Sequence, residues 1–239
     1  MKFNSAQFSK NTKKTAVIFA LLIFTLGFTA CKNEVQQPED VSALSVINAS
    51  PDFPSVDFFV NDQRFNYMPI EFGGDKVTYF RQMTGSLNGK VRSANDIKVL
   101  YSGDFNLVKG KYNSLFILSK AKDISYVVVQ DEVIDPSWNK NTARVRFANL
   151  SSDAPAYNLE LQGDTTNFKN ISYKGFTGYR NVTPSKYTVN LKNNTTNIQV
   201  ATLANVEFVA GRNYTVWAKG LVTPATDAQK TAIQVSLHQ

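Results

Sequence analysis

The chain has 239 residues, of which 43% are hydrophobic and 12% aromatic, and this is enough for one or two folded domains. The composition excludes bulk disorder, because a chain this apolar can bury a core. The formal net charge of +7 is misleading, since four lysines and no acidic residue lie within residues 1–30. The rest of the chain carries 22 basic and 19 acidic residues without a Lys/Arg stripe, which argues against nucleic-acid binding.

Residues 1–30 have the order of a secretory lipoprotein signal peptide. A basic segment ends at Lys14, an uncharged and mostly apolar stretch follows at residues 15–30, and Cys31 comes next. The apolar stretch is short for a stable membrane span. Its ending, LGFTAC, resembles a bacterial lipobox with Phe28 in place of the usual leucine, and implies cleavage before Cys31 and lipid attachment to its sulfur. The alternative is an uncleaved N-terminal anchor helix.

Residues 31–42 are polar and predict a tether between the lipid and the folded part. Cys31 is the only cysteine, so we expect no disulfide, no cysteine-based zinc site and no redox pair. Lys32 stands where an inner-membrane retention signal has aspartate, which favours the outer membrane. The acidic Glu34 and Glu39 resemble surface-export signals of Bacteroidota-type lipoproteins, and the choice between surface and periplasmic orientation stays open.

An internal repeat covers the remainder of the chain. The segment NASPDFPSVDFFVND begins at Asn48 and matches NLSSDAPAYNLELQG, which begins at Asn149, with Asn, Ser, Asp and Pro at a common offset of 101 residues. Two further blocks match in the same order, residues 80–86 with 179–185 and residues 105–116 with 206–217. Three ordered blocks predict a duplicated domain.

Both repeats alternate apolar and polar residues as β-strands do. ARVRFAN, residues 143–149, is one example, and turn-forming Gly and Pro recur between such stretches. No long stretch after the tether has a helical apolar period. We therefore predict an all-β chain of two tandem immunoglobulin-like antiparallel β-sandwiches, at residues 43–130 and 143–239, joined by a linker at residues 131–142.

Two apolar runs depart from this alternation. Residues 114–119 read SLFILS and residues 126–130 read YVVVQ. Continuous apolar runs are typical of strands covered on both faces. We expect these two strands where the repeats touch each other.

The repeated Asn-x-Ser-x-Asp-x-Pro segment, here called the corner motif, contains in its second copy a Ser-Ser-Asp triplet that by itself suggests a reactive site. Its recurrence between two strands instead predicts a structural turn, because Asn, Ser and Asp bond nearby backbone and Pro fixes φ. We expect Asp52 and Asp153 each to accept hydrogen bonds within its own loop and to contribute about 1–2 kcal/mol. The predicted turn residues are Asn48, Asp52, Pro54, Asn149, Asp153 and Pro155.

The second repeat resembles the domain of unknown function family DUF4397. The resemblance rests on RVRFANLSSDAPAYNLEL, GYRNVTPSKYTVNL and FVAGRNYTVWAKG, and the first repeat matches more loosely. Pro184 stands near a position where the family often has glycine. The resemblance implies immunoglobulin-like sandwiches, often in tandem, in bacterial envelope proteins, and it implies no catalytic residues.

Catalytic and metal chemistry have little support in the sequence. The single histidine, His238, is next to the C-terminus, where we expect a frayed residue unable to act as a rigid base. Clustered zinc ligands are missing, and calcium would depend on Asp52, Asp57 and Asp153, which are too few for a tight loop. We therefore expect no catalytic residue, no metal site, no nucleotide loop and no cofactor.

Two aromatic residues are candidates for stacking on a ligand. Phe59 breaks the alternation of its strand and is expected to point outward, and Trp138 lies in the linker, where packing between the repeats is an equal alternative. Eight further aromatic residues could stack on a sugar ring if they are exposed, and most of them are assigned to the core or to packing between the repeats: Phe53, Tyr67, Phe72, Tyr79, Phe80, Tyr173, Phe176 and Tyr179. The triplet at residues 164–166, DTT, resembles an O-glycosylation acceptor with Thr165 modified, and its alternative is a polar hairpin loop.

These observations predict a lipid-anchored cell-envelope protein with a non-enzymatic structural, adhesive or binding role. The alternative is an accessory glycan- or ligand-binding lipoprotein of a polysaccharide-uptake system. The expected partners are a membrane, reached through the N-terminal lipid, and a glycan or a protein. The oligomeric state stays open.

Overall fold

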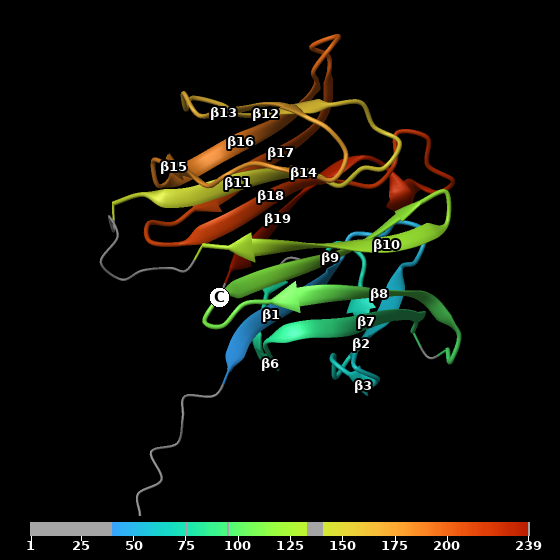
Figure 1. Ribbon diagram of the computed structural model, residues 1–239. Coiled ribbons are helices and arrows are strands. Elements are labelled where there is room, and N and C mark those ends of the chain that lie inside the picture. The colour runs from blue at the N-terminus through green and yellow to red at the C-terminus, as the bar shows by residue number, and fades with distance from the viewer. Residues whose placement is uncertain (1–39, 75, 95, 133–140, 239) are drawn as a thin grey trace, which may run out of the picture. The chain divides into compact units, whose positions relative to one another are not determined.

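The computed structural model describes residues 40–74, 76–94, 96–132 and 141–238. Regular structure in this part of the chain is β-strand, apart from the three-residue 3₁₀ helix η1 (Asp227–Gln229) (Figure 1). The prediction of an all-β chain is confirmed, but the sheets are mixed and not purely antiparallel, because the first strand of each repeat pairs in parallel with a later strand. Across the described residues, no helix has the length and apolar character needed to cross a membrane.

The first repeat is built from two sheets. Its strands are β1 (Val41–Asn48), β2 (Ser55–Val60), β3 (Gln63–Arg64), β4 (Ile70–Glu71), β5 (Lys76–Val77), β6 (Phe80–Met83), β7 (Gly85–Ser93), β8 (Val99–Leu107), β9 (Tyr112–Lys120) and β10 (Asp123–Asp131). One sheet has the order β10-β9-β1-β6, and the other has the order β3-β2-β7-β8 with β4 also paired to β2. All pairings in these sheets are antiparallel except β1 with β9.

The second repeat copies this plan. Its strands are β11 (Ala143–Asn149), β12 (Tyr157–Leu161), β13 (Asn167–Ile171), β14 (Gly175–Phe176), β15 (Arg180–Val182), β16 (Ser185–Asn193), β17 (Gln199–Phe208), β18 (Asn213–Lys219) and β19 (Ala232–His238). One sheet has the order β13-β12-β16-β17, and the other has the order β14-β11-β18-β19-β5 with β15 also paired to β11. β5 of the first repeat therefore forms the end strand of a sheet in the second repeat.

Each repeat has its own apolar core, filled by the inward side of alternating strands. β7 and β16 bury every second residue in the same pattern, Leu87 and Val91 in one repeat and Val189 and Leu191 in the other. Polar residues on the opposite side of these strands face water. The alternation in the sequence therefore arises because one face of the sheet packs on the core and the other face does not.

A third apolar core lies between the repeats. It joins buried residues of β9 and its neighbours with buried residues of β11 and β18, and the largest are Phe116 and Trp217. β9 is buried over seven consecutive residues, which confirms the coverage on both faces expected for residues 114–119. β10 is only half-buried because it is the end strand of its sheet, although Val127 packs against this third core and Val128 against the core of the first repeat.

Strand register relates the repeats residue by residue. Asn48 pairs with Ile117 across β1 and β9, and Asn149 pairs with Ala218 across β11 and β18, so the offset of 101 holds on both strands. Phe116 and Trp217 are equivalent by this offset, and their ring centroids are 6.3 Å apart. A residue that contacts its own equivalent is what a two-fold relation between repeats produces. The residues from Asp40 onward form one compact unit.

Candidate functional site

The asparagine of the corner motif holds the turn in both repeats. Asn48 Oδ1 accepts the N–H of Ser50 at 2.9 Å, and its Nδ2 donates to the carbonyl groups of Phe53 and Ile70. Asn149 repeats this arrangement, accepting from Ser151 N–H and donating to the carbonyl oxygens of Pro155 and Ile171. Both asparagines have no exposed surface, so their three bonds satisfy buried backbone groups that a strand ladder cannot reach. Pro54 and Pro155 are exposed in the same two turns.

The expectation that Asp52 and Asp153 bond within their own loops is wrong. Asp153 accepts the backbone N–H of Val222 at 2.8 Å and the backbone N–H and hydroxyl of Thr223 at 2.9 and 2.7 Å. Asp52 accepts one weaker bond, from the backbone N–H of Lys122 at 3.3 Å. Both carboxylates reach across to the turn that follows the equivalent strand, β18 or β9, because the packed sheets bring these two ends of the repeat together.

Asp153 is an anchor for the loop between β18 and β19. Burial acts to raise the pKa of Asp153, but the hydrogen bonds from Thr223 and Val222 together outweigh it and hold the pKa below its usual range. The carboxylate is therefore ionised and fully used by the loop. In the first repeat the corresponding connection between β9 and β10 is only a two-residue turn, Ala121 and Lys122, both with positive φ.

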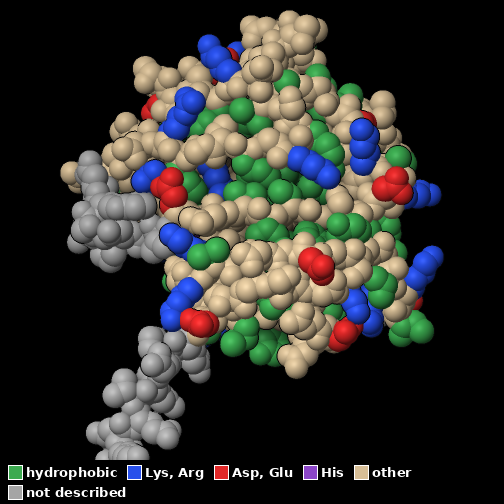
Figure 2. Space-filling view, in the orientation of Figure 1, with side chains coloured by type: hydrophobic (Ala, Val, Ile, Leu, Met, Phe, Trp, Pro, Cys, Tyr) green, Lys and Arg blue, Asp and Glu red, His purple; other side chains and the backbone are tan. Residues whose placement is uncertain are grey.

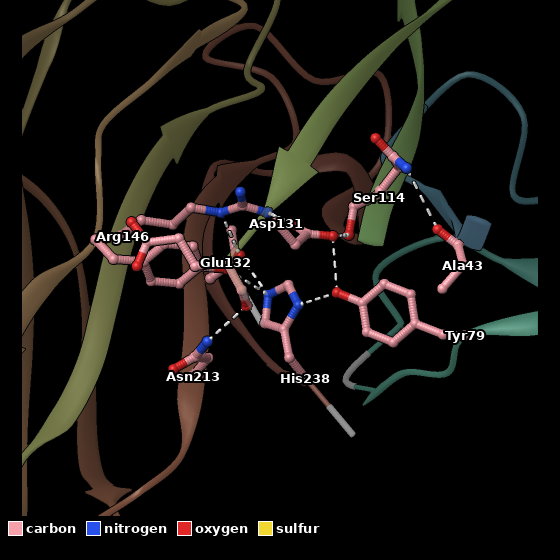
Figure 3. A network of polar contacts seen from close by, with 11 residues as sticks. Ala43, Tyr79, Ser114, Asp131, Glu132, Arg146, Asn213 and His238 are labelled. Carbon is pink, nitrogen blue, oxygen red and sulfur yellow. Dashed lines mark hydrogen bonds and ion pairs between the residues drawn. The ribbon is translucent and has the colours of Figure 1, made fainter. Parts of the chain in front are cut away.

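A closed ring of hydrogen bonds, here called the polar ring, lies between the repeats (Figure 3). Arg146 Nη2 donates to Asp131 Oδ1 at 2.5 Å, and Arg146 Nε donates to Thr215 Oγ1 at 2.8 Å. Asp131 Oδ2 accepts the hydroxyl of Tyr79 at 2.7 Å. His238 closes the ring, with Nδ1 2.7 Å from the Tyr79 oxygen and Nε2 2.7 Å from the Thr215 oxygen.

The polar ring fixes the protonation of His238. The Tyr79 hydroxyl donates its hydrogen bond to Asp131, so the Tyr79 oxygen must act as the acceptor for His238 Nδ1–H. His238 Nε2 then carries no proton and accepts a hydrogen bond from the Thr215 hydroxyl. Burial lowers the pKa of His238 to about 4, while the charge of Asp131 acts to raise it and that of Arg146 to lower it. His238 is therefore neutral at pH 7 and held in one tautomer.

The expectation that His238 is frayed is wrong. It is 3% exposed, and its strand β19 lies between β18 and β5, where Leu237 and His238 pair with the backbone of Lys76 and Val77. The sheet encloses the end of the chain because the first repeat supplies the outer strand. This could not be read from the position of His238 in the sequence.

The polar ring connects the two repeats, and its charged groups are buried away from solvent. Asp131 and Arg146 are 3% and 1% exposed, and Ser114 also donates to Asp131 at 2.6 Å. Burial raises the pKa of Tyr79, as does the neighbouring carboxylate of Asp131, so the phenol stays protonated. No group of three or more side chains suited to a metal ion occurs in the described residues.

The loop between β18 and β19 covers a cavity of about 390 Å³ in the second repeat, here called the loop pocket. Gly220 opens this loop with a φ of 82°, and a Cβ there would lie 2.2 Å from the Lys230 carbonyl oxygen. Gln229 ties the loop to the first repeat by donating to the Pro51 carbonyl at 3.0 Å. The loop pocket is lined by Pro155, Tyr157, Asn193, Val200, Leu221, Val222, Pro224, Lys230 and Thr231.

A shallow depression of about 250 Å³ lies on the first repeat, here called the aromatic groove. Tyr67 is 86% exposed and Phe80 40% exposed, and the two rings lie 6.4 Å apart. Hydrophobic side chains reach the surface at the lower edge of Figure 2, where Figure 1 places β3 and β6. The aromatic groove is lined by Val60, Gln63, Arg64, Phe65, Tyr67, Phe80, Arg81 and Gln82.

The two aromatic residues preferred from the sequence, Phe59 and Trp138, are not the ones that the structure leaves exposed, although Tyr67 and Phe80 are among the wider set. Phe59 is half-buried, and the Arg92 guanidinium lies over its ring at 4.3 Å from the centroid. Trp138 and Cys31 lie outside the described residues. Exposure of Tyr67 and Phe80 follows from the folding of the β3 and β6 segments, and nothing in the local sequence distinguishes these rings from core aromatics.

The remaining candidates have ordinary surroundings. Asp57 forms an ion pair with Arg64 at 2.6 Å and accepts from the Asn66 side chain at 2.9 Å. Thr165 is exposed in the turn between β12 and β13, where Asp164 accepts the N–H of Thr166, and its glycosylation stays a prediction.

Comparison with solved structures returns a distant match. A family CBM26 module, CBMbc of Eubacterium rectale Amy13K, crystallised in complex with maltoheptaose, is 10% identical and aligns over 82% of this chain and 95% of its own. Its TM-score of 0.25 is too low to establish a shared fold, and its ligand is a property of that protein. No curated protein matches the chain.

The family comparison is specific. The model of DUF4397, described as a domain of unknown function, matches residues 42–160 and again residues 143–236. The two matches begin at the first strand of each repeat and together span nearly the whole described part of the chain. This chain therefore belongs to the DUF4397 family.

Proposed function

We propose that this chain is a non-enzymatic binding protein of the cell envelope, held to a membrane by lipid at Cys31, which binds a glycan in the aromatic groove. The observation that carries the proposal is the pair of exposed rings, Tyr67 and Phe80, beside planar polar side chains. A soluble protein seldom leaves such rings exposed together unless they contact a partner.

The chemistry of the aromatic groove suits a sugar. A pyranose ring has a C–H face that packs on an aromatic ring and a rim of hydroxyl groups that need hydrogen-bond partners. Phe80 and Tyr67 offer the aromatic surface, while Gln63 and Gln82 bring amide donors and acceptors to the same depression. Arg64 is oriented at its edge by the ion pair with Asp57.

We propose a non-enzymatic role because of the positions of the titratable side chains. His238 is the only histidine of the chain, and it is buried in the polar ring rather than at either cavity. Asp153, which bonds the backbone of the pocket-lining residue Val222, is fully occupied by three bonds to the loop. Neither residue is poised to transfer a proton to a bound ligand.

Binding should be measured with the full-length chain, purified in detergent, on an array of bacterial and plant polysaccharides. We expect at least one polysaccharide to bind and Tyr67→Ala with Phe80→Ala to weaken that binding at least tenfold. Ile97→Ala, at a side chain that is 89% exposed elsewhere on the first repeat, is the matched control and should leave binding unchanged. No binding to any polysaccharide, or binding that the double variant leaves intact, would overturn the glycan proposal.

Anchoring is tested separately, in cells. Labelled fatty acid should be incorporated into the wild-type chain and not into Cys31→Ser, which should leave the membrane fraction. Lys32→Ala is the control for a change next to the anchor and should still be labelled. A Cys31→Ser chain that stays membrane-bound would indicate an uncleaved anchor helix instead of a lipid.

A further inference from the structure

The loops that precede β9 and β18 contain the same short sequence, and these two segments are here called the loop tips. Residues 108–111 read VKGK and residues 209–212 read VAGR, at the common offset of 101. The valine is 53% exposed in the first and 47% exposed in the second. The glycine N–H donates to the carbonyl of Val41 at 2.9 Å in one repeat and of Thr142 at 2.8 Å in the other, so both loop tips are held in place. One exposed valine is ordinary at a protein surface, but a repeated one beside a cation indicates a use outside the core.

Both loop tips lie at the end of the molecule where the tether joins. The Asn213 side chain, at the first residue of β18, donates to the Glu132 carbonyl at 3.0 Å. Glu132 directly follows β10, whose last residue pairs with Tyr112 at the start of β9. β9 and β18 therefore begin close to each other. The Lys109 ammonium of the first loop tip lies 2.6 Å from the carboxylate of Asp40, where the described part of the chain begins.

Two cations at this end have no acidic partner. Lys111 and Arg212 are equivalent by the offset, are exposed, and form no ion pair within the part of the chain that the structure describes. The acidic side chains around them already have a basic neighbour each: Asp40 has Lys109, Glu132 has Arg144, and Glu207 has Lys186 opposite it in strand register. The loop tips therefore combine positive charge with exposed aliphatic side chains.

The far ends of the same strands provide a comparison. Ile97 precedes β8 and Ile198 precedes β17, and these two equivalent side chains are 89% and 64% exposed. β8 has nine residues and β17 has ten, so each isoleucine lies about 30 Å from the loop tip of its repeat. Ile97 stands between Asp96 and Lys98, whose charges cancel, and the residues on either side of Ile198 are uncharged. The far end therefore exposes aliphatic side chains without the excess of positive charge.

We propose that the loop tips of both repeats rest on the anionic phospholipid headgroups of the bilayer to which the tether is attached. Lys111 and Arg212 donate hydrogen bonds to lipid phosphates, and the two valines enter the headgroup layer. This inference rests on the anchoring at Cys31 proposed above. The fully extended chain from Cys31 to Asp40 spans at most about 32 Å. Because the anchor confines the loop tips near the bilayer, a contact too weak to recruit a free protein is populated.

Fluorescence quenching in proteoliposomes tests this contact. Full-length chains with Val108→Cys, Val209→Cys, Ile97→Cys or Ile198→Cys are labelled with a thiol-reactive NBD dye. They are reconstituted into vesicles of phosphatidylcholine and phosphatidylglycerol that contain a lipid with a nitroxide on its headgroup. We expect quenching at the two valine positions to be at least twofold stronger than at the two isoleucine positions. The wild-type chain, carried through the same labelling, reports any dye attached to Cys31.

Charge reversal tests the cause of the contact. Lys111→Glu with Arg212→Glu should remove the excess quenching at Val209→Cys. The matched control is Lys98→Glu with Lys120→Glu, which makes the same change of charge at exposed positions of the far end and should leave the quenching unchanged. Excess quenching that survives the first pair of substitutions would overturn the assignment to anionic headgroups.

Flotation of the same vesicles separates this proposal from the anchoring. Chains that float with the vesicles and are quenched mainly at the loop tips support both. Chains that float but are quenched equally at all four positions overturn the headgroup contact and leave the anchoring intact. Chains that stay at the bottom of the gradient overturn the anchoring and the contact with it.

Discussion

The two repeats have the same strand arrangement and differ in the loops at the ends of the strands. β7 and β16 bury the same alternate positions, and Asn48 and Asn149 make the same three bonds. At the ends of the strands the copies diverge, since a two-residue turn follows β9 and a twelve-residue loop, residues 220–231, follows β18. Packing requirements hold the strands to one pattern, while loops at the surface are free to change and to acquire a cavity.

The contact between the repeats shows a second divergence, at equivalent positions. Register places Asp131 opposite Tyr112 in one repeat and Leu237 opposite Tyr214 in the other. Continued by one residue, the second register brings His238 to Asn213, the equivalent of Tyr112, so a buried carboxylate in one repeat corresponds to a buried imidazole in the other. Strand register makes Phe80 equivalent to Arg180, one residue away from the match in the sequence, so Tyr79 and Tyr179 occupy corresponding positions before β6 and β15. Both tyrosines contact His238. An interface between identical copies would bury two like groups, and the difference between the copies allows complementary ones to meet.

The largest effect should come from breaking the polar ring. Arg146→Met leaves the carboxylate of Asp131 buried without its cation and should lower the free energy of unfolding by about 3–5 kcal/mol in urea denaturation. Adding Asp131→Asn should restore much of this loss. Ser45→Ala, at the equivalent buried position in the first repeat, should cost far less. A loss below about 1 kcal/mol for Arg146→Met would show that the polar ring does not fasten the repeats.

Low pH should lower the free energy of unfolding, because protonation of His238 disrupts the polar ring between the repeats. The unfolded chain takes up a proton near pH 6.5, whereas the folded chain takes it up only near pH 4, so stability is complete above pH 6.5 and falls as the pH drops towards 4. The loss at pH 4 should approach about 3 kcal/mol. His238→Gln should remove this dependence between pH 7 and pH 5. Equal slopes for variant and wild type would contradict the assigned burial.

The corner motif offers a matched pair of variants. Asn48→Ala and Asn149→Ala should each lower the free energy of unfolding by about 2 kcal/mol, because buried backbone groups lose their partner. The two losses should agree, since the bonds correspond one to one. Asn106→Ala, on the exposed side of β8, should change stability by less than about 0.5 kcal/mol. A large difference between the repeats would indicate that one corner is held by other contacts.

The smallest effects should separate the two aspartates. Asp153→Ala should cost about 1–2 kcal/mol because three short bonds are lost, and Asp52→Ala about 0.5 kcal/mol because one bond of 3.3 Å is lost. Asp153→Ala should also increase proteolysis in the loop between β18 and β19. Equal losses for the two variants would contradict a special role of Asp153 in holding the loop.

Much of the fold could be predicted because it depends on neighbours in the chain. The alternation in residues 143–149, the apolar run at residues 114–119 and the recurrence of the corner motif each follow from the local covalent order. The turn at Asn149 could be predicted for the same reason, since its partners lie in the next few residues and in the strand that returns to it. The loop pocket could not, because its walls come from segments spread between Pro155 and Thr231. The aromatic groove is lined only by residues within the range 60–82, and what could not be predicted there is which of its rings stay exposed.

What the sequence determined by itself was the class of fold, the duplication and the family, since alternation and repetition are properties of the linear order. Only the tertiary structure decided that Asp153 holds a loop 69 residues away and that His238 is buried beside a strand of the other repeat. The physical reason is that hydrogen-bond partners and burial depend on distance in space. Packing of the sheets sets that distance, and no local pattern in the sequence records it.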